Sequence, residues 1–268
     1  MGIDGVFDAP NASAQYDAIM RALSDPPVRI RSLTARDGQI LWLKRAERMT
    51  PWLRLTKGAA NRNFEKDRAA LRVLGRAGMP VAPIVAEGPD FVVTPDLGVT
   101  LRTLMDDPGL DDAKRREVFA AAGAALARLH ASGFSHGRPA VRDICWDGQD
   151  VHFIDFERFS LRRSALRHRA LDVVIFVHSI FSIRTAAPRS LAEAAMAAYV
   201  AGAPAEFASS LRRLLWGLAP LGAACRAVLL VRPGSREVAA VPLMLDFLTE
   251  LTERLRPADL PAAGAAPR

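Results

Sequence analysis

The hydrophobic pattern of the chain changes at Asp96-Leu97-Gly98, and this change limits the folds open to it. Residues 28–95 contain short extended segments and one helical segment, whereas most of the chain from Leu101 onward repeats its apolar residues at helical spacing. Strands followed by a run of helices are typical of α+β proteins. We therefore expect a small β-sheet plus helix lobe at 1–96, with 1–27 unassigned, a mainly helical lobe at 97–256, and a disordered tail at 257–268.

The first lobe is predicted from two extended segments and the turn between them. Val28–Thr34 and Gln39–Ala46 are rich in β-branched and large apolar residues, and they flank Arg36-Asp37-Gly38. Because Asp-Gly is a strong signal for a tight turn, these segments predict a β-hairpin. The other elements expected here are a helix at about 61–75, ended by Gly75 or Gly78, and strands at 84–87 and 91–94.

The second lobe is predicted from helical repeats of apolar residues. A helix capped by Asp111 or Asp112 should run to Ala131, because alanine, valine and leucine form one continuous apolar face on it. A loop from Gly133 to Gly137 and two short extended segments, around Ile144 and at 151–156, should follow. Further helices are expected at about 168–183, 190–200, 206–231 and 236–255.

Two apolar runs, Val173–Ile183 and Leu214–Val231, are the longest in the chain, and each is interrupted by a polar residue. Neither offers the roughly 18 to 20 uninterrupted apolar residues of a membrane span, so we expect both to be buried helices, with a membrane span as the alternative for Leu214–Val231. Asp4 and Asp8 stand where a secretory signal would carry basic residues. This predicts a cytoplasmic protein.

Four positions, in this order, point to phosphoryl transfer: Lys44 in a strand, Glu65 in the next helix, a His-Gly loop after the long helix, and Asp155 after an extended segment. Period-2 alternation places Trp42 and Lys44 on one strand face, and Glu65 adjoins the apolar stripe that contains Phe64. We therefore expect Lys44 to contact Glu65. This contact would fix the ammonium of Lys44 against nucleotide phosphates. The alternative is a solvated lysine and a surface glutamate.

Two segments, Leu129–Gly137 and Phe153–Arg158, resemble the catalytic core of kinase-like phosphotransferases. Ile154-Asp155-Phe156-Glu157-Arg158 is similar to the Asp-Phe-x-Arg variant of the lipopolysaccharide-core and Kdo kinase family. The resemblance spans about 28–180 and rests on the order and spacing of short motifs. It implies a bilobal protein-kinase-like fold, with ATP- and Mg²⁺-dependent phosphoryl transfer to a hydroxyl of a glycolipid or sugar.

The resemblance also implies a role for each candidate residue. Lys44 and Glu65 would orient the phosphates, and Asp155 with Asp143 would hold Mg²⁺ through hard oxygen donors. The candidate catalytic residues are Asp143, Arg138 and His136, of which His136 is expected to brace the loop. Asp172 stands where such folds carry an Asp that supports this loop, and a plain helix N-cap is the alternative.

Three departures from the family pattern favour a second interpretation. Arg138 occupies the position of the catalytic Asp, and a guanidinium cannot accept a hydroxyl proton. The chain has no Gly-x-Gly-x-x-Gly lid, unless the segment before Val28 replaces it, and Trp42 stands where a small residue would cover the adenine. The alternative is a pseudokinase that acts as a regulatory or binding module.

The formal net charge of +7 suggests anionic partners. The arginines lack the aromatic interleaving of a nucleic-acid platform, so an unrelated helical nucleic-acid-binding protein is only a third interpretation. A basic group after Asp155 could receive an anionic acceptor or a lipid headgroup, which includes peripheral contact with an anionic inner membrane, or could be a solvated face. Its members are Arg158, Arg162, Arg163, Arg167 and Arg169.

Overall fold

The computed structural model describes residues 12–46, 51–160, 165–183, 185 and 187–255, without the side chains of 12–14 and 51–61. The chain divides into two compact units. The first comprises 1–98 and 152–159, and the second comprises 99–151 and the residues from 160 onward. Segment 152–159, which the sequence analysis placed in the helical lobe, thus belongs to the first unit. The predicted tail at 257–268 lies outside the described residues.

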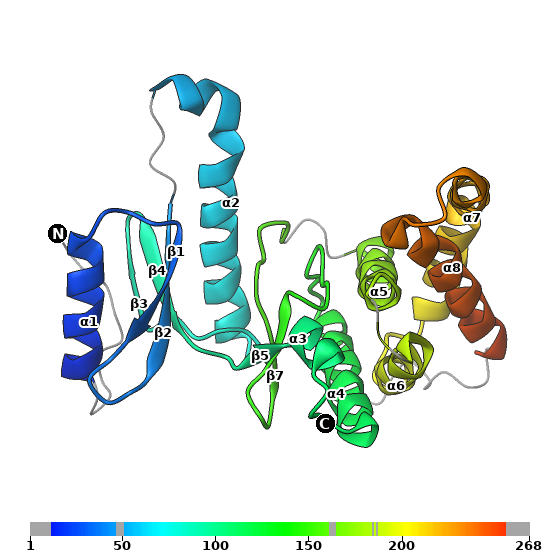
Figure 1. Cartoon of the computed structure of the whole chain (residues 1–268), viewed down its shortest axis with the longest axis horizontal. Coiled ribbons are helices and arrows are strands. Elements are labelled where there is room, and N and C mark those ends of the chain that lie inside the picture. The colour runs from blue at the N-terminus through cyan, green and yellow to red at the C-terminus, as the bar shows by residue number, and fades with distance from the viewer. Residues whose placement is uncertain (1–11, 47–50, 161–164, 184, 186, 256–268) are drawn as a thin grey trace, which may run out of the picture. The chain divides into compact units, whose positions relative to one another are not determined.

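The first unit is built on an antiparallel sheet with the strand order β1-β2-β4-β3 (Figure 1). Its strands are β1 (Ile30–Thr34), β2 (Ile40–Arg45), β3 (Ala86–Gly88) and β4 (Phe91–Pro95). The β1–β2 hairpin is confirmed, with Ile30 opposite Lys44 and Gly38 in the turn at a φ of 85°. β2 also pairs with β4, so Lys44 lies opposite Val92.

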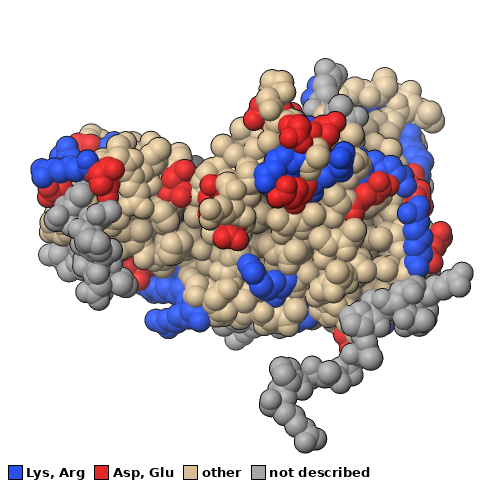
Figure 2. Space-filling view, turned by 90° about the horizontal axis from the view of Figure 1, so that it is seen from below, with Lys and Arg blue, Asp and Glu red and all other residues tan. Residues whose placement is uncertain are grey.

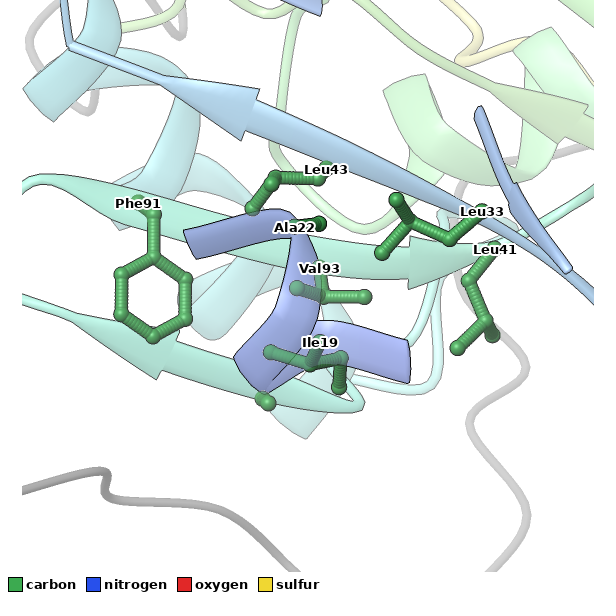
Figure 3. Close-up of a cluster of buried hydrophobic side chains, with 8 residues drawn as sticks. Ile19, Ala22, Leu33, Leu41, Leu43, Phe91 and Val93 are labelled. Atoms are coloured by element: carbon green, nitrogen blue, oxygen red, sulfur yellow. The ribbon is translucent and has the colours of Figure 1, made fainter. Parts of the chain in front are cut away.

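The two faces of this sheet have different surroundings. Leu41 and Leu43 point into a buried cluster to which α1 (Ala12–Ser24), a helix not predicted from the sequence, contributes Ile19 and Ala22 (Figure 3). Successive side chains of a strand point to opposite faces of the sheet, so Ile40, Trp42 and Lys44 of β2 point to the other face. That face carries Ile40 and Trp42, which are exposed, and Lys44, which is half-buried.

Helix α2 (Pro51–Arg76) begins earlier than predicted and ends as predicted. At its C-terminus, Gly78 takes a φ of 67°, its N–H donates to the carbonyl of Gly75, and the N–H of Met79 donates to the carbonyl of Leu74. This pair of bonds is a Schellman motif, which satisfies the last helical carbonyls and uses a glycine because the conformation is left-handed.

The second unit is mainly helical. Together with the antiparallel sheet of the first unit, it confirms the α+β class. Asp111 caps α4 as expected, since its Oδ1 accepts from the N–H of Lys114 at 2.7 Å. β5, β6 and β7 form a small sheet in that order, and the last two residues of β7 belong to the first unit. The elements are β5 (Val99–Thr100), α3 (Leu101–Asp106), α4 (Asp112–Ala131), β6 (Ile144–Trp146), β7 (Val151–Phe153), α5 (Leu166–Phe181), α6 (Pro188–Ala201), α7 (Phe207–Val231) and α8 (Arg236–Arg254).

The two long apolar runs have different fates. The prediction of a buried helix is confirmed for α5, where Val173, Phe176 and Ile180 are fully or almost fully buried. For α7 the prediction is wrong, because most of its apolar residues face outward and Trp216 is 85% exposed. Among the described residues, α7 is long and apolar enough to cross a membrane by length and composition.

Helices α4 and α6 pack closely through a glycine. A Cβ built on Gly123 would overlap the backbone carbonyl of Ala195. The absence of a side chain at Gly123 therefore allows the two helix backbones to approach each other.

We expect Gly123→Ala to lower the free energy of unfolding by about 1–3 kcal/mol, because overpacking outweighs the better helix propensity of alanine. Gly217→Ala in α7, where a Cβ meets nothing within 4 Å, is the control and should raise stability by about 0.5–1 kcal/mol. Urea denaturation checks both values. Equal effects of the two substitutions would contradict the close packing of α4 on α6.

Candidate active site

Lys44 of β2 is held by a carboxylate from α2. Its Nζ lies 2.8 Å from Oδ2 of Asp67, and Oε1 of Glu157 is 3.7 Å away. The side chains of Lys44 and Asp67 are only 18% and 6% exposed. Because an unpaired charge in such a place is costly, the ion pair fixes the position of the amine.

The predicted pairing of Lys44 with Glu65 is wrong. Glu65 lies on the exposed side of α2, where its Oε2 accepts from Arg68 at 2.7 Å. Asp67 follows two residues later, about 200° around the helix, and lies on the buried stripe with Phe64 and Leu71. A charged residue within an apolar stripe is the sequence signal that could have identified Asp67, since buried charges are normally paired.

The second oxygen of Asp67 binds the backbone next to Asp155. Oδ1 accepts from the N–H of Phe156 at 2.7 Å, while Oδ2 accepts from Lys44. One carboxylate therefore holds both the amine of Lys44 and the residue that follows Asp155. Asp67 thus links Lys44 to the segment that contains Asp155.

Asp155 has an unusual backbone conformation. Its φ is 64°, and it is the one non-glycine residue with positive φ in the described part of the chain. Aspartate tolerates this region better than most residues, and such strain persists where the surroundings impose it. Here the surroundings are anchored on both sides: the N–H of Phe153 donates to the carbonyl of Pro80, and Phe156 is fully buried.

Glu157 also belongs to this site, although the sequence analysis gave it no role. Its Oε1 accepts from Arg29 at 2.9 Å, and its Oε2 accepts from the amide of Asn63 at 3.4 Å. Together with the nearby amine of Lys44, these contacts connect the segment after Asp155 to both β2 and α2. No simple sequence signal distinguishes Glu157 from a surface glutamate.

In the second unit, Asp172 holds the loop that contains His136. Its Oδ2 accepts from the N–H of His136 at 2.6 Å, and its Oδ1 accepts from the N–H of Gly137 at 2.9 Å. The alternative of a helix N-cap is wrong, because α5 begins at Leu166 and Ala165 is its N-cap. The bracing contact implied by the family resemblance is thus present.

His130 and Tyr199 extend this buried network. Nε2 of His130 lies 3.3 Å from Oδ2 of Asp172, and Nδ1 lies 2.7 Å from the hydroxyl of Tyr199. Burial lowers the pKa of His130 below 6.5, although Asp172 opposes this shift. The neutral ring fits both contacts, because its Nε2–H donates to the carboxylate and its Nδ1 accepts from the hydroxyl.

The candidate catalytic residues of this loop lie together. Nε of Arg138 is 3.9 Å from Oδ2 of the buried Asp143, and Nε of Arg142 is 3.5 Å from Oδ1. His136 is fully buried, and its Nδ1 accepts from the N–H of Arg138 at 3.3 Å. His136 therefore braces the loop, as expected, and Asp143 lies in a strongly basic environment.

The other predicted positions are distributed over both units. Within the part of the chain that the structure describes, no three His, Cys, Asp or Glu residues gather closely enough to form a metal site by themselves. In the basic group, Arg158 and Arg167 are exposed, Arg169 is half-buried, and Arg162 and Arg163 lie outside the described residues. On the face shown in Figure 2, basic side chains alternate with acidic ones and do not form one continuous positive field.

Comparison with known proteins identifies the family of the chain. A family model described as "Lipopolysaccharide kinase (Kdo/WaaP) family" matches residues 53–186, which is half of the chain. The chain belongs to this family, and the predicted relationship is confirmed. The matched range contains Asp67, Asp143, Asp155 and Asp172, whereas Lys44 precedes it.

Two individual proteins are also similar. An uncharacterized protein of Haemophilus influenzae (strain ATCC 51907 / DSM 11121 / KW20 / Rd) is 30% identical over 144 residues, which are 54% of this chain and 60% of that protein. The crystal structure of WbdD matches with a TM-score of 0.40 and 16% identity, over 68% of this chain and 46% of that one. The matches cover less than two thirds of the length of either of these proteins.

The position of Asp67 predicts that replacing either of two acidic residues of α2 with alanine will change stability by different amounts. Asp67→Ala should lower the free energy of unfolding by about 2–4 kcal/mol, because it leaves the amine of Lys44 and the N–H of Phe156 without this acceptor. The control Glu65→Ala should cost less than about 0.5 kcal/mol, since an exposed ion pair contributes little. Chemical denaturation distinguishes the two, and a larger cost for Glu65→Ala would refute the assignment of Asp67.

The lowered pKa of His130 predicts acid sensitivity. Below pH 6.5 the unfolded chain binds a proton that the folded state does not, so stability falls as the pH falls toward the folded pKa, by up to about 1.4 kcal/mol per pH unit. Denaturation curves of wild type and His130→Gln across this range measure the effect. The variant should show a smaller slope, and identical slopes would show that His130 does not contribute.

Proposed function

We propose that the protein transfers a phosphoryl group from ATP to a hydroxyl of a sugar in a lipopolysaccharide-type glycolipid. Membership of the lipopolysaccharide kinase family supports the reaction class. The observation that carries the proposal is the carboxylate of Asp67, which binds the amine of Lys44 with one oxygen and the backbone after Asp155 with the other. A fixed cation beside a fixed carboxylate is the minimum that phosphoryl transfer requires.

The residues present fit ATP and Mg²⁺. Lys44 is held firmly but keeps part of its surface in solvent, which suits contact with a phosphate. Asp155 offers hard oxygen donors of the kind that Mg²⁺ prefers, and Asp143 is the proposed second donor. A bound Mg²⁺ would neutralise the charge of the transferred group.

The exposed part of the sheet face that carries Lys44 is a candidate surface for the nucleobase. Trp42 lies on it two residues before Lys44 in β2 and is 41% exposed, and its Nε1 donates to Oδ1 of Asp96 at 2.7 Å. This bond fixes the ring and leaves much of the indole accessible. We therefore assign Trp42 to base stacking in place of the small residue of the usual pattern.

The loop of the second unit would act on the acceptor hydroxyl. Asp143 is the proposed proton acceptor, because Arg138 stands where the family pattern has the catalytic Asp and cannot accept a proton. Phosphoryl transfer has a loose transition state and requires little from a base, so Arg138 would stabilise the transferred charge. His136 positions the loop through its bond to the backbone of Arg138.

A pseudokinase is the second candidate, and one observation favours it. Asp143 is buried and lies within 4.0 Å of Arg138 and Arg142, which compete with a metal ion for its oxygens. A module of this kind would bind nucleotide or a partner without turnover. For the kinase, the proposed glycolipid acceptor suggests work at the cytoplasmic face of a membrane.

Thermal-shift titration with ATP and Mg²⁺ tests the proposal. Wild type should gain a higher midpoint, because a ligand that binds only the folded state stabilises it, and Lys44→Met and Asp155→Asn should lose most of this gain. Glu65→Gln is the matched control and should behave as wild type. The absence of a shift in wild type would exclude the kinase.

Turnover separates the two candidates. With ATP, Mg²⁺ and lipopolysaccharide core oligosaccharides, the kinase should release ADP, and Asp143→Asn should lower the rate at least about 100-fold if Asp143 is the base. ATP binding without ADP release would support the pseudokinase.

A further inference from the structure

The outer face of α7 is an apolar surface that the rest of the described chain leaves uncovered. Its members lie between Trp216 and Val231 and are all exposed, and Trp216, Leu230 and Val231 are 85%, 87% and 82% exposed. The outer face consists of Trp216, Pro220, Leu221, Ala223, Ala224, Ala227, Val228, Leu230 and Val231. Single exposed apolar side chains are common, but an exposed apolar stripe that continues from Trp216 to Val231 marks an interaction surface.

The opposite side of α7 is occupied. Leu211, Leu215 and Gly222 are buried, and a Cβ built on Gly222 would clash with Leu245 of α8, so α7 and α8 pack closely there. Arg226 of α7 is also paired with Asp246 of α8 at 2.6 Å. α7 is therefore one layer of a helical hairpin, with one side in the protein and one side outward.

The charges around the outer face favour an anionic surface. Helix α7 contains no Asp or Glu, and Arg212 and Arg213 flank the outer face at one end while Arg232 follows it at the other. From Glu206 to Asp246 the chain carries five arginines and three acidic residues. A second copy of the chain would bring these arginines against each other, whereas anionic lipid headgroups would neutralise them.

We propose that the outer face of α7 docks onto an anionic lipid surface, with the helix lying in the interface. One side of α7 is an apolar stripe that includes a tryptophan, and arginines lie at both ends of this stripe. The opposite side packs against the protein. This is the arrangement of an interfacial helix. A spanning helix would have to separate from α8 and carry Arg226 into the hydrocarbon. The inference does not depend on the proposed catalytic activity.

Flotation of the full chain with vesicles tests the proposal. Vesicles of phosphatidylglycerol and phosphatidylethanolamine should bind the protein at least about tenfold better than phosphatidylcholine vesicles, and binding should weaken at high salt. Trp216→Glu and Leu230→Glu should each lower binding at least about tenfold, because each places a charge on the apolar stripe. Leu171→Glu, at a 39% exposed leucine of α5, is the matched control and should bind as wild type.

Three results would overturn the proposal. Unchanged vesicle binding by both outer-face variants, with unchanged thermal midpoints, would show that another surface binds lipid. Failure of the wild type to bind, with a dimer in sedimentation that Trp216→Glu converts to a monomer, would assign the outer face to a second copy. Bound protein that resists carbonate extraction would indicate a spanning helix, whereas we expect its release.

Discussion

The first unit depends on the two interactions made by the carboxylate of Asp67. This carboxylate joins a helix, a strand and a segment distant in sequence, because one oxygen takes the ammonium of Lys44 and the other takes the N–H of Phe156. Ion pairs on a surface contribute little, but a pair that is largely removed from water imposes one geometry. The same carboxylate therefore orders the fold and fixes the position of Lys44 and of the backbone next to Asp155.

The second unit is also organised by the carboxylate of one buried aspartate, Asp172. Asp172 lies within α5 and accepts hydrogen bonds from two backbone N–H groups of the loop that contains His136. His130 contacts the same carboxylate, and Tyr199 contacts His130. Backbone donors in a loop are costly to bury without acceptors, so a charged acceptor within a helix fixes the loop. Each unit thus positions its candidate residues through one buried aspartate.

The sequence predicted much of the fold because local signals dominate there: Asp-Gly for the hairpin, Gly78 for the end of α2 and Asp111 for the start of α4. It named Lys44 and Asp155 as candidates but paired Lys44 with Glu65 and not with Asp67, since family patterns specify residue types while the helix face decides which carboxylate reaches the lysine. The exposure of α7 was missed because composition cannot tell a core helix from one with an uncovered side. Tertiary packing decides both.

The left-handed backbone at Asp155 restricts what could replace this residue. Glycine and asparagine adopt that conformation at little cost, whereas most other side chains resist it. A relative could therefore exchange its carboxylate for either of them and retain the same loop, anchored through Phe156. Active and inactive members of such a family would be alike in backbone shape, and only the chemistry of a single side chain would tell them apart.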